Sequence, residues 1–195
     1  MSEKRIVVFL SGRGSNFRAI ADAVERGEIP GTRIAAVFAD QPEAAGLLEA
    51  KRRGISAHVV PRLPGTKRRE HERALREILD PLEPDLICLA GYMRLLTPEF
   101  VAAYRGRILN IHPSLLPKFP GLEAQRRTLE AGEKISGCTV HVVDEGLDSG
   151  PIIVQRTVPV LPDDDEETLA ARILEQEHRA YPEAIRKVLA GLRKT

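Results

Sequence analysis

Asn110 and His112 lie two positions apart at the end of the apolar segment 107–111, which is predicted to be a strand. Side chains two apart in a strand point to the same face of a sheet. An amide beside an imidazole can bind a carbonyl oxygen and stabilise it as an oxyanion, and the imidazole can transfer a proton near neutral pH. A lone histidine is more often structural. Asn110, however, is one of only two asparagines in the chain, which favours a catalytic role for the pair.

A second polar cluster occupies residues 144–150, with the sequence DEGLDSG, and it crowds three carboxylates among glycines. Any one of these acids is equally typical of an ordinary surface turn. Asp148 beside a protonated His112 would keep that imidazole charged and oriented. Metal binding is an alternative use of the carboxylates, although the spacing of an EF-hand is absent.

The glycine-rich segment 11–16 connects a predicted strand to a predicted helix. Glycines allow a sharp turn there, and the N-terminus of a helix offers free N–H groups to an anion. Asp40 at the end of the second strand suggests a dinucleotide site, but Phe17 occupies the third glycine position of that fingerprint. A monophosphate site therefore fits better, and a plain strand-to-helix turn is the alternative. The residues expected to bind the phosphate are Gly12, Arg13, Gly14, Ser15 and Asn16.

Glu177 lies on the apolar stripe of the last predicted helix, residues 165–192. A carboxylate in such a stripe needs a partner or a ligand. We expect Glu177 to bind ribose hydroxyls, and a salt-bridged or partly solvated glutamate is the alternative.

The remaining histidines and the serines give weaker signals. His141 lies in an alternating strand pattern and is expected to face either the site or the core, while His58 and His71 are expected on the surface. Ser11 and Ser114 lack the Gly-x-Ser-x-Gly context of a hydrolase nucleophile, which excludes a serine hydrolase.

Strands and helices alternate along the first half of the chain. This order predicts an α/β fold with an open, doubly wound and mostly parallel sheet. Two later segments alternate apolar and polar residues, and they predict an antiparallel pair at the sheet edge. The expected strands are 5–10, 33–39, 57–61, 85–90, 107–111, 137–143 and 151–160, and the expected helices are 16–26, 42–53, 67–79, 97–103 and 165–192.

The composition excludes several classes of protein. The 195 residues carry 29 Lys and Arg against 28 Asp and Glu, so a strongly basic nucleic-acid binder is not expected. No apolar run is long enough to span a bilayer, and the N-terminus lacks the pattern of a signal peptide. The two cysteines, Cys88 and Cys138, are too few for a disulfide framework. A reducing, cytoplasmic location is therefore expected.

Four segments together resemble the phosphoribosylglycinamide formyltransferases, folate-dependent enzymes of purine synthesis. They are SGRGSNF at 11–17, AGYMRLL at 90–96, ILNIHPSLLPKFPG at 108–121 and TVHVVDEGLDSGPII at 139–153. The resemblance covers nearly the whole chain. It implies a Rossmann-like formyltransferase fold in one domain, 1–195, with a nucleotide-binding half of about 1–100 and a folate-binding and catalytic half of about 101–195.

The resemblance also implies roles for individual residues. Asn110, His112 and Asp148 match the catalytic residues of the family, and Glu177 matches its substrate-binding glutamate. The residues that match its folate-binding positions are Arg68, Met93, Arg94, Leu95, Leu96, Asn110 and Asp144. The implied substrates are glycinamide ribonucleotide and 10-formyltetrahydrofolate, the latter as co-substrate, with no metal. A monomer or a homodimer is expected, without nucleic acid or membrane as partner.

Three alternatives remain at this stage. A formyltetrahydrofolate hydrolase would use water in place of the amine, and such relatives usually carry a further N-terminal domain. A methionyl-tRNA formyltransferase would need an RNA-binding domain and a basic surface. A nucleotide-binding module without catalysis would need only segment 11–16, and would have no need for Asn110, His112 and Asp148 together.

Overall fold

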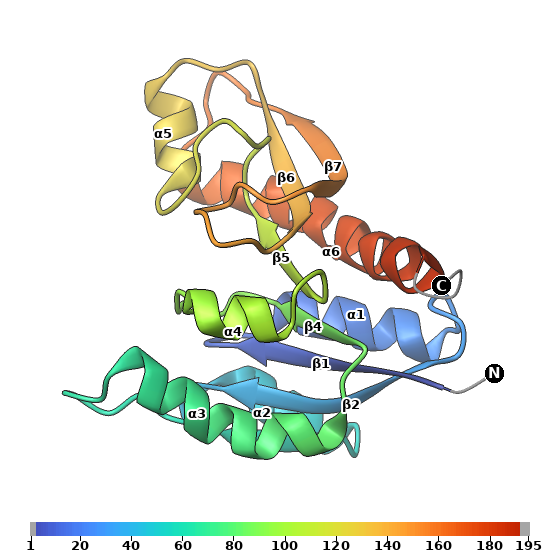
Figure 1. The fold of residues 1–195 in the computed structure, drawn as a ribbon. Helices are drawn as coiled ribbons and strands as arrows, with labels where there is room; N and C mark the ends of the chain where they lie inside the picture. Colours follow the sequence, from blue (N-terminus) through green and yellow to red (C-terminus); the bar gives the residue numbers. More distant parts are fainter. Residues whose placement is uncertain (1–2, 192–195) are drawn as a thin grey trace.

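A computed structural model describes residues 3–191 of the chain, which form one seven-stranded sheet flanked by helices on both faces (Figure 1). The strand order is β3-β2-β1-β4-β5-β6-β7. The strands are β1 (Lys4–Leu10), β2 (Thr32–Ala39), β3 (Ser56–Val59), β4 (Leu86–Leu89), β5 (Ile108–His112), β6 (Ile135–Val142) and β7 (Ile152–Pro159). The helices are α1 (Ser15–Glu25), α2 (Ala45–Arg52), α3 (Arg68–Leu79), the short 3-10 helix η1 (Asp80–Leu82), α4 (Pro98–Ala103), α5 (Ala124–Glu130) and α6 (Glu166–Gly191).

The sheet has the predicted mixture of strand directions. β1 pairs in parallel with β2 and β4, and the parallel pairing continues to β3 on one side and β5 on the other. β6 pairs antiparallel to β5, and β7 antiparallel to β6. The expected α/β fold, with antiparallel strands at one edge, is therefore confirmed.

Apolar residues of the central strands bury both faces of the sheet, as expected where helices cover both sides. Neighbouring residues of β1 show this, because Val8 packs in one apolar cluster and Phe9 in the other. The cluster with Val8 includes residues of α1, α2 and α6, and the cluster with Phe9 includes residues of α3 and α4. The first cluster joins the two ends of the chain, since α6 packs against both α1 and β7.

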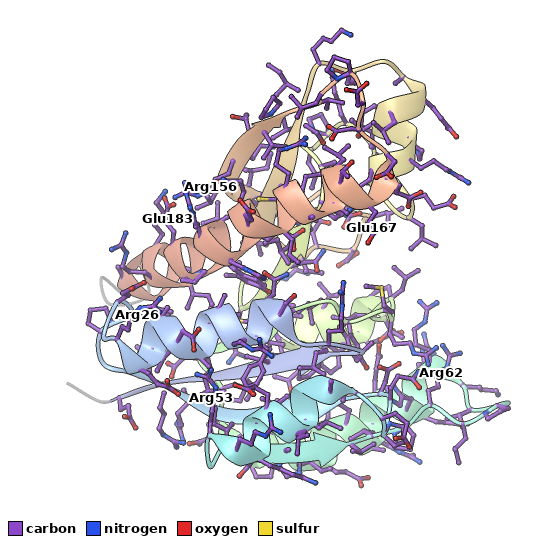
Figure 2. All side chains as sticks on the ribbon, turned by 180° about the vertical axis from the view of Figure 1, so that it is seen from behind. Arg26, Arg53, Arg62, Arg156, Glu167 and Glu183 are labelled. Carbon is purple, nitrogen blue, oxygen red and sulfur yellow. The ribbon has the colours of Figure 1, made fainter. Side chains whose placement is uncertain are left out.

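Two arginines link neighbouring elements on the back of the molecule, where both are labelled in Figure 2. Arg156 of β7 donates a hydrogen bond of 2.7 Å to Glu183 of α6. Arg53, which follows α2, forms an ion pair of 2.7 Å with Asp22 of α1. The first pair links α6 to the sheet, and the second links the end of α2 to α1.

The structure corrects two expectations. Helix α5 occupies part of a segment for which no helix was expected, between the proline-rich loop and β6. His71 is buried, not at the surface, and the Val60 carbonyl oxygen, 2.7 Å from its Nε2, satisfies the buried ring nitrogen. The expected end of the last helix at residue 192 lies outside the described residues.

None of the helices among residues 3–191 is both long enough and apolar enough to cross a membrane.

Candidate active site

Asn110 and His112 lie near the carboxyl end of β5, on the same face of the sheet, where open α/β sheets bind their ligands. Asp148 reaches both of them from the loop between β6 and β7. Its Oδ2 lies 3.4 Å from His112 Nδ1, and its Oδ1 accepts a hydrogen bond of 3.5 Å from Asn110 Nδ2. The three residues predicted to be catalytic therefore lie in one cluster.

Asp148 is held in place by its backbone and by a further donor. Its φ of 50° lies in the left-handed region, which Asp and Asn adopt more readily than most residues. The Gly121 N–H donates to Oδ2 at 2.8 Å. Burial acts to raise the pKa of Asp148, but hydrogen bonds from His141 and Gly121 and the nearby His112 outweigh it and lower the pKa to about 2. Asp148 is therefore a carboxylate at neutral pH.

Both ring nitrogens of His112 face oxygen acceptors. Nδ1 faces the Asp148 carboxylate, and Nε2 lies 2.8 Å from the Phe119 carbonyl oxygen. The two nitrogens can donate toward these acceptors at the same time only when both carry a proton. The loop containing Phe119 is itself held by Ser114, whose Oγ donates to the Lys118 carbonyl oxygen at 2.6 Å. The loop after His112 thus contributes a carbonyl acceptor directly to the site.

His141 is a fourth member of the cluster. It is paired with Asn110 in the antiparallel register of β5 and β6. Its Nε2 lies 3.3 Å from Asn110 Nδ2 and 3.5 Å from Asp148 Oδ1, and its Nδ1 lies 3.1 Å from the Val142 carbonyl oxygen. The open question of its direction is settled, because it faces the site. Only the strand register could have revealed this.

The glycine-rich segment 11–16 forms a loop that ends at the N-terminus of α1. Gly14 has a φ of 72°, and a Cβ atom there would lie 2.8 Å from the Gly46 backbone. The Gly46 N–H donates to the Gly12 carbonyl oxygen at 3.2 Å. The loop is therefore tightly packed on α2, while Gly12 and Arg13 are exposed to solvent.

Asn16 and Glu177 form a buried pair between the first and last helices. Asn16 Nδ2 donates to Glu177 Oε2 at 2.7 Å. Asn16 Oδ1 is buried and has no hydrogen-bond partner among residues 3–191. Burial raises the pKa of Glu177, and the bond from Asn16 opposes that shift in part. The prediction that Glu177 needs a partner is thus met by Asn16, and the ligand role stays a prediction.

Exposed apolar side chains occur on the loops near this end of the sheet. Met93 is 70% exposed and Leu95 62%, in the segment after β4. Leu122 is 80% exposed and Leu147 54%, and their loops adjoin at Gly121, where a Cβ would lie 3.3 Å from Leu147. Such surfaces suit a flat, partly apolar ligand.

Two other residues predicted to bind folate, Asp144 and Arg68, differ in the hydrogen bonds that hold their side chains. Asp144 Oδ1 accepts hydrogen bonds from Gly146 N at 3.0 Å and Ser149 Oγ at 2.8 Å, which order the loop carrying Asp148. Arg68 is exposed at the start of α3. Within the described part of the chain, Arg68 forms no hydrogen bond or ion pair with the segment 93–96.

Asp40 has a different partner from the ribose of a dinucleotide. Arg94 Nε donates to its Oδ2 at 2.5 Å, which ties the end of β2 to the segment after β4. No group of three His, Cys, Asp or Glu side chains that could hold a metal ion occurs within residues 3–191.

The sequence model of the formyl transferases matches residues 4–185. The chain belongs to the formyl transferase family. This membership implies a folate-derived formyl donor.

Individual relatives indicate which members of the family this chain resembles. A crystal structure of phosphoribosylglycinamide formyltransferase from Brucella melitensis is 53% identical, with a TM-score of 0.91 and 97% of each chain covered. The phosphoribosylglycinamide formyltransferase of Escherichia coli K12 is 46% identical over 177 residues, which are 91% of this chain and 83% of that protein. The trifunctional purine biosynthetic protein adenosine-3 of Drosophila melanogaster is 48% identical over 96% of this chain, which spans 14% of that longer protein.

Within the formyl transferase family, these relatives favour a phosphoribosylglycinamide formyltransferase over the alternatives inferred from the sequence. The resemblance inferred from segments 11–17, 90–96, 108–121 and 139–153 is confirmed at the level of the family and of its named relatives.

Proposed function

We propose that this protein transfers the formyl group of 10-formyltetrahydrofolate to the amine of glycinamide ribonucleotide. The observation that carries the proposal is the cluster of Asn110, His112 and Asp148, with Asp148 within 3.5 Å of both other side chains, at the carboxyl end of β5. An amide donor, an imidazole and a carboxylate can together promote an acyl-type transfer through a tetrahedral intermediate, by stabilising the oxyanion and transferring protons.

The amine nitrogen of the nucleotide attacks the formyl carbon of the folate, and the formyl C=O becomes a C–O⁻ group. The Asn110 amide and the protonated His112 stabilise this oxyanion. The attacking nitrogen then gives its extra proton to water, and the C–O⁻ group re-forms C=O as the bond between the formyl carbon and folate N10 breaks. N10 takes a proton from His112, and the proton released to water restores the protonated imidazole of His112. Tetrahydrofolate and the formylated nucleotide are the products, and the number of protons balances.

The surroundings of His112 define what the substrate must displace. In the structure, His112 Nε2 faces the Phe119 carbonyl oxygen at 2.8 Å, while Nδ1 faces Asp148. The substrate oxyanion must replace one of these acceptors. Asp148 keeps its charge because its pKa is low, so we assign it the role of holding His112 protonated. His141, on the neighbouring strand β6, would hold the side chains of Asn110 and Asp148 in position.

The two substrates would bind next to each other, on the loops that follow the carboxyl ends of the parallel strands. We assign the nucleotide phosphate to the N-terminus of α1 with Gly12, Arg13, Gly14, Ser15 and Asn16, because its free N–H groups favour an anion. Glu177 would bind the ribose hydroxyls. We assign the folate to Arg68, Met93, Arg94, Leu95, Leu96, Asn110 and Asp144. Holding both substrates at one cluster supplies much of the rate acceleration by orientation.

The decisive experiment mixes the pure protein with 10-formyltetrahydrofolate and measures tetrahydrofolate release with and without glycinamide ribonucleotide. Release only with the nucleotide, together with formylated nucleotide, is the expected result. Release without it would show a hydrolase, and no release from folded protein would leave a binding module. We also expect the reaction to proceed without added metal or nucleic acid, which treatment with a chelator would check for the metal. We expect a cytoplasmic monomer or homodimer, and sedimentation would distinguish these two oligomeric states.

A further inference from the structure

Asp40 lies directly after β2 and is only 3% exposed, yet no step of the proposed reaction uses it. Its Oδ2 accepts the bond from Arg94 Nε at 2.5 Å and a longer contact of 3.4 Å from Gln41 Nε2. β2, β1 and β4 are adjacent in the sheet, so Asp40 lies at the same edge as the segment that follows β4. The proposed function assigns that segment to the folate.

The pairing of Asp40 is poorly suited to stabilising the fold. Burying a carboxylate costs free energy that a single ion pair often fails to recover. Asp40 Oδ1 is buried and has no hydrogen-bond partner among residues 3–191, so that oxygen is desolvated without compensation. Asp164 provides the contrast, because Arg172 donates to both of its oxygens at 2.6 and 2.7 Å. A role other than stability better explains the incomplete pairing of Asp40.

The backbone of the segment after β4 is fixed by other residues. Ser11 N donates to the Gly91 carbonyl oxygen at 3.0 Å, and Met93 N donates to Ser11 Oγ at 2.9 Å. Further along, Thr97 N donates to the buried Glu72 at 2.7 Å. None of these bonds reaches the Arg94 side chain, which lies between the fixed points. Asp40 is what orients it.

The orientation leaves useful donors free. Arg94 is engaged through Nε, and its two terminal nitrogens have no hydrogen-bond partner within residues 3–191. The side chain is 32% exposed. A guanidinium held at Nε presents its terminal nitrogens as a fixed pair, which matches the geometry of an oxygen acceptor.

We propose that Asp40 is a positioning residue for folate binding, acting by orienting the Arg94 guanidinium toward acceptor oxygens of the folate. The inference rests on the proposed function. Without Asp40, Arg94 would sample many rotamers, and each binding event would have to order it again. Asp40 touches no reacting atom, so its loss should weaken folate binding without slowing the chemistry.

The test measures steady-state kinetics with each substrate varied, and tetrahydrofolate affinity by calorimetry, for Asp40→Asn. We expect the KM for 10-formyltetrahydrofolate and the Kd for tetrahydrofolate to rise up to about tenfold, the cost of ordering one mobile arginine side chain at each binding event. The kcat and the KM for glycinamide ribonucleotide should stay within about twofold. Asp40→Glu, which keeps the carboxylate, should recover part of the affinity.

The matched control is Asp164→Asn, which breaks an ion pair before α6, at the opposite end of β7 from the Asp148 loop. It should lower thermal stability and leave both KM values unchanged. If Asp40→Asn behaves in the same way, or if its effect persists undiminished when Arg94 is already Ala, the positioning role is wrong.

Two further measurements allow the proposal to be tested even if Asp40→Asn does not fold or the proposed function is wrong. Should Asp40→Asn fail to fold, Arg94→Lys removes the Nε donor but keeps the charge, and the same rise in folate KM and Kd is expected. An unchanged KM and Kd in that variant would refute the proposal. Turnover by the unmodified enzyme is measured first, so a failure of the proposed function is distinguished from a failure of the role of Asp40.

Discussion

At the scale of single residues, the cluster around His112 depends on a carboxylate that stays charged. Asp148 keeps a pKa of about 2 although it is largely buried, because donors from Gly121 and His141 offset the cost of desolvation. Asp148 also has a left-handed backbone, with a φ of 50°. Asn tolerates this conformation, so Asp148→Asn separates the chemistry of the carboxylate from the shape of the loop.

We expect Asp148→Asn to lower kcat by at least about a hundredfold, because His112 loses the charge that holds it protonated and oriented. The KM values should change little, and steady-state kinetics would show the difference. Asp163→Asn, an exposed acid before α6, is the control and should match the unmodified enzyme. Turnover retained by Asp148→Asn would mean that Asp148 is not central to the mechanism.

Glu177→Gln should change how the stability of the protein depends on pH. Burial raises the pKa of Glu177 in the folded state. Folding is therefore favoured while Glu177 is protonated, and the unmodified protein loses this stabilisation as pH rises through the folded-state pKa. Gln keeps the shape and an oxygen acceptor for Asn16 but has no charge to bury. We therefore expect the difference in Tm, variant minus unmodified protein, to increase from pH 4 to pH 8 in thermal melts. An equal difference at both pH values would contradict this.

Which site residues could be predicted depends on how local their signal is. Asn110 and His112 could be found because the two-residue period of a strand puts them on one face. His141 could not be placed, since its position beside Asn110 depends on the register of β5 with β6. The pairing of Asp40 with Arg94 joins residues 54 positions apart, and no local pattern indicates it.

At the scale of elements, the turn into α1 depends on two glycines in contact. Gly14 has a φ of 72°, and a Cβ there would lie 2.8 Å from the Gly46 backbone. Gly27, just after the same helix, has a φ of 73° but open space around it. The two positions therefore share the conformational requirement and differ in packing.

We expect Gly27→Ala to lower the free energy of unfolding by about 1–2 kcal/mol, the cost of a left-handed backbone with a side chain. Gly14→Ala should lower it further, because α2 must also shift. Only Gly14→Ala should raise the KM for glycinamide ribonucleotide, because it distorts the loop assigned to the phosphate. Urea unfolding and steady-state kinetics would check both effects, and equal losses of stability would argue against the contact with Gly46.

Most elements could be predicted because their apolar pattern is strong, as in the continuous run of β4. Helix α5 has no comparable signal in the sequence. No side chain caps its first turn, and the residue before it, Glu123, has a left-handed backbone with a φ of 57°, which a sequence pattern does not indicate. The burial of His71 was missed because α3 is highly polar in sequence. Its burial depends on the Val60 carbonyl oxygen, which only the tertiary fold brings near.

At the scale of the whole molecule, one apolar cluster spans both halves of the chain. It contains Val8 of β1, Val140 of β6 and Tyr181 of α6. Neither half can keep this cluster buried by itself. The expected nucleotide-binding and catalytic halves therefore share one core.

We expect the protein to unfold in a single calorimetric transition whose van't Hoff and calorimetric enthalpies agree. Two separate transitions, or a difference between near-UV and far-UV circular dichroism melts, would show that the halves fold independently.

The bond between Asn16 and Glu177 joins residues 161 positions apart. During synthesis, the loop before α1 leaves the ribosome long before Glu177 of α6. The proposed nucleotide pocket is thus completed only after all seven strands of the sheet have been made. Chains stalled before Glu177 emerges should not retain glycinamide ribonucleotide, so a nascent chain would acquire this substrate only once the whole sheet exists.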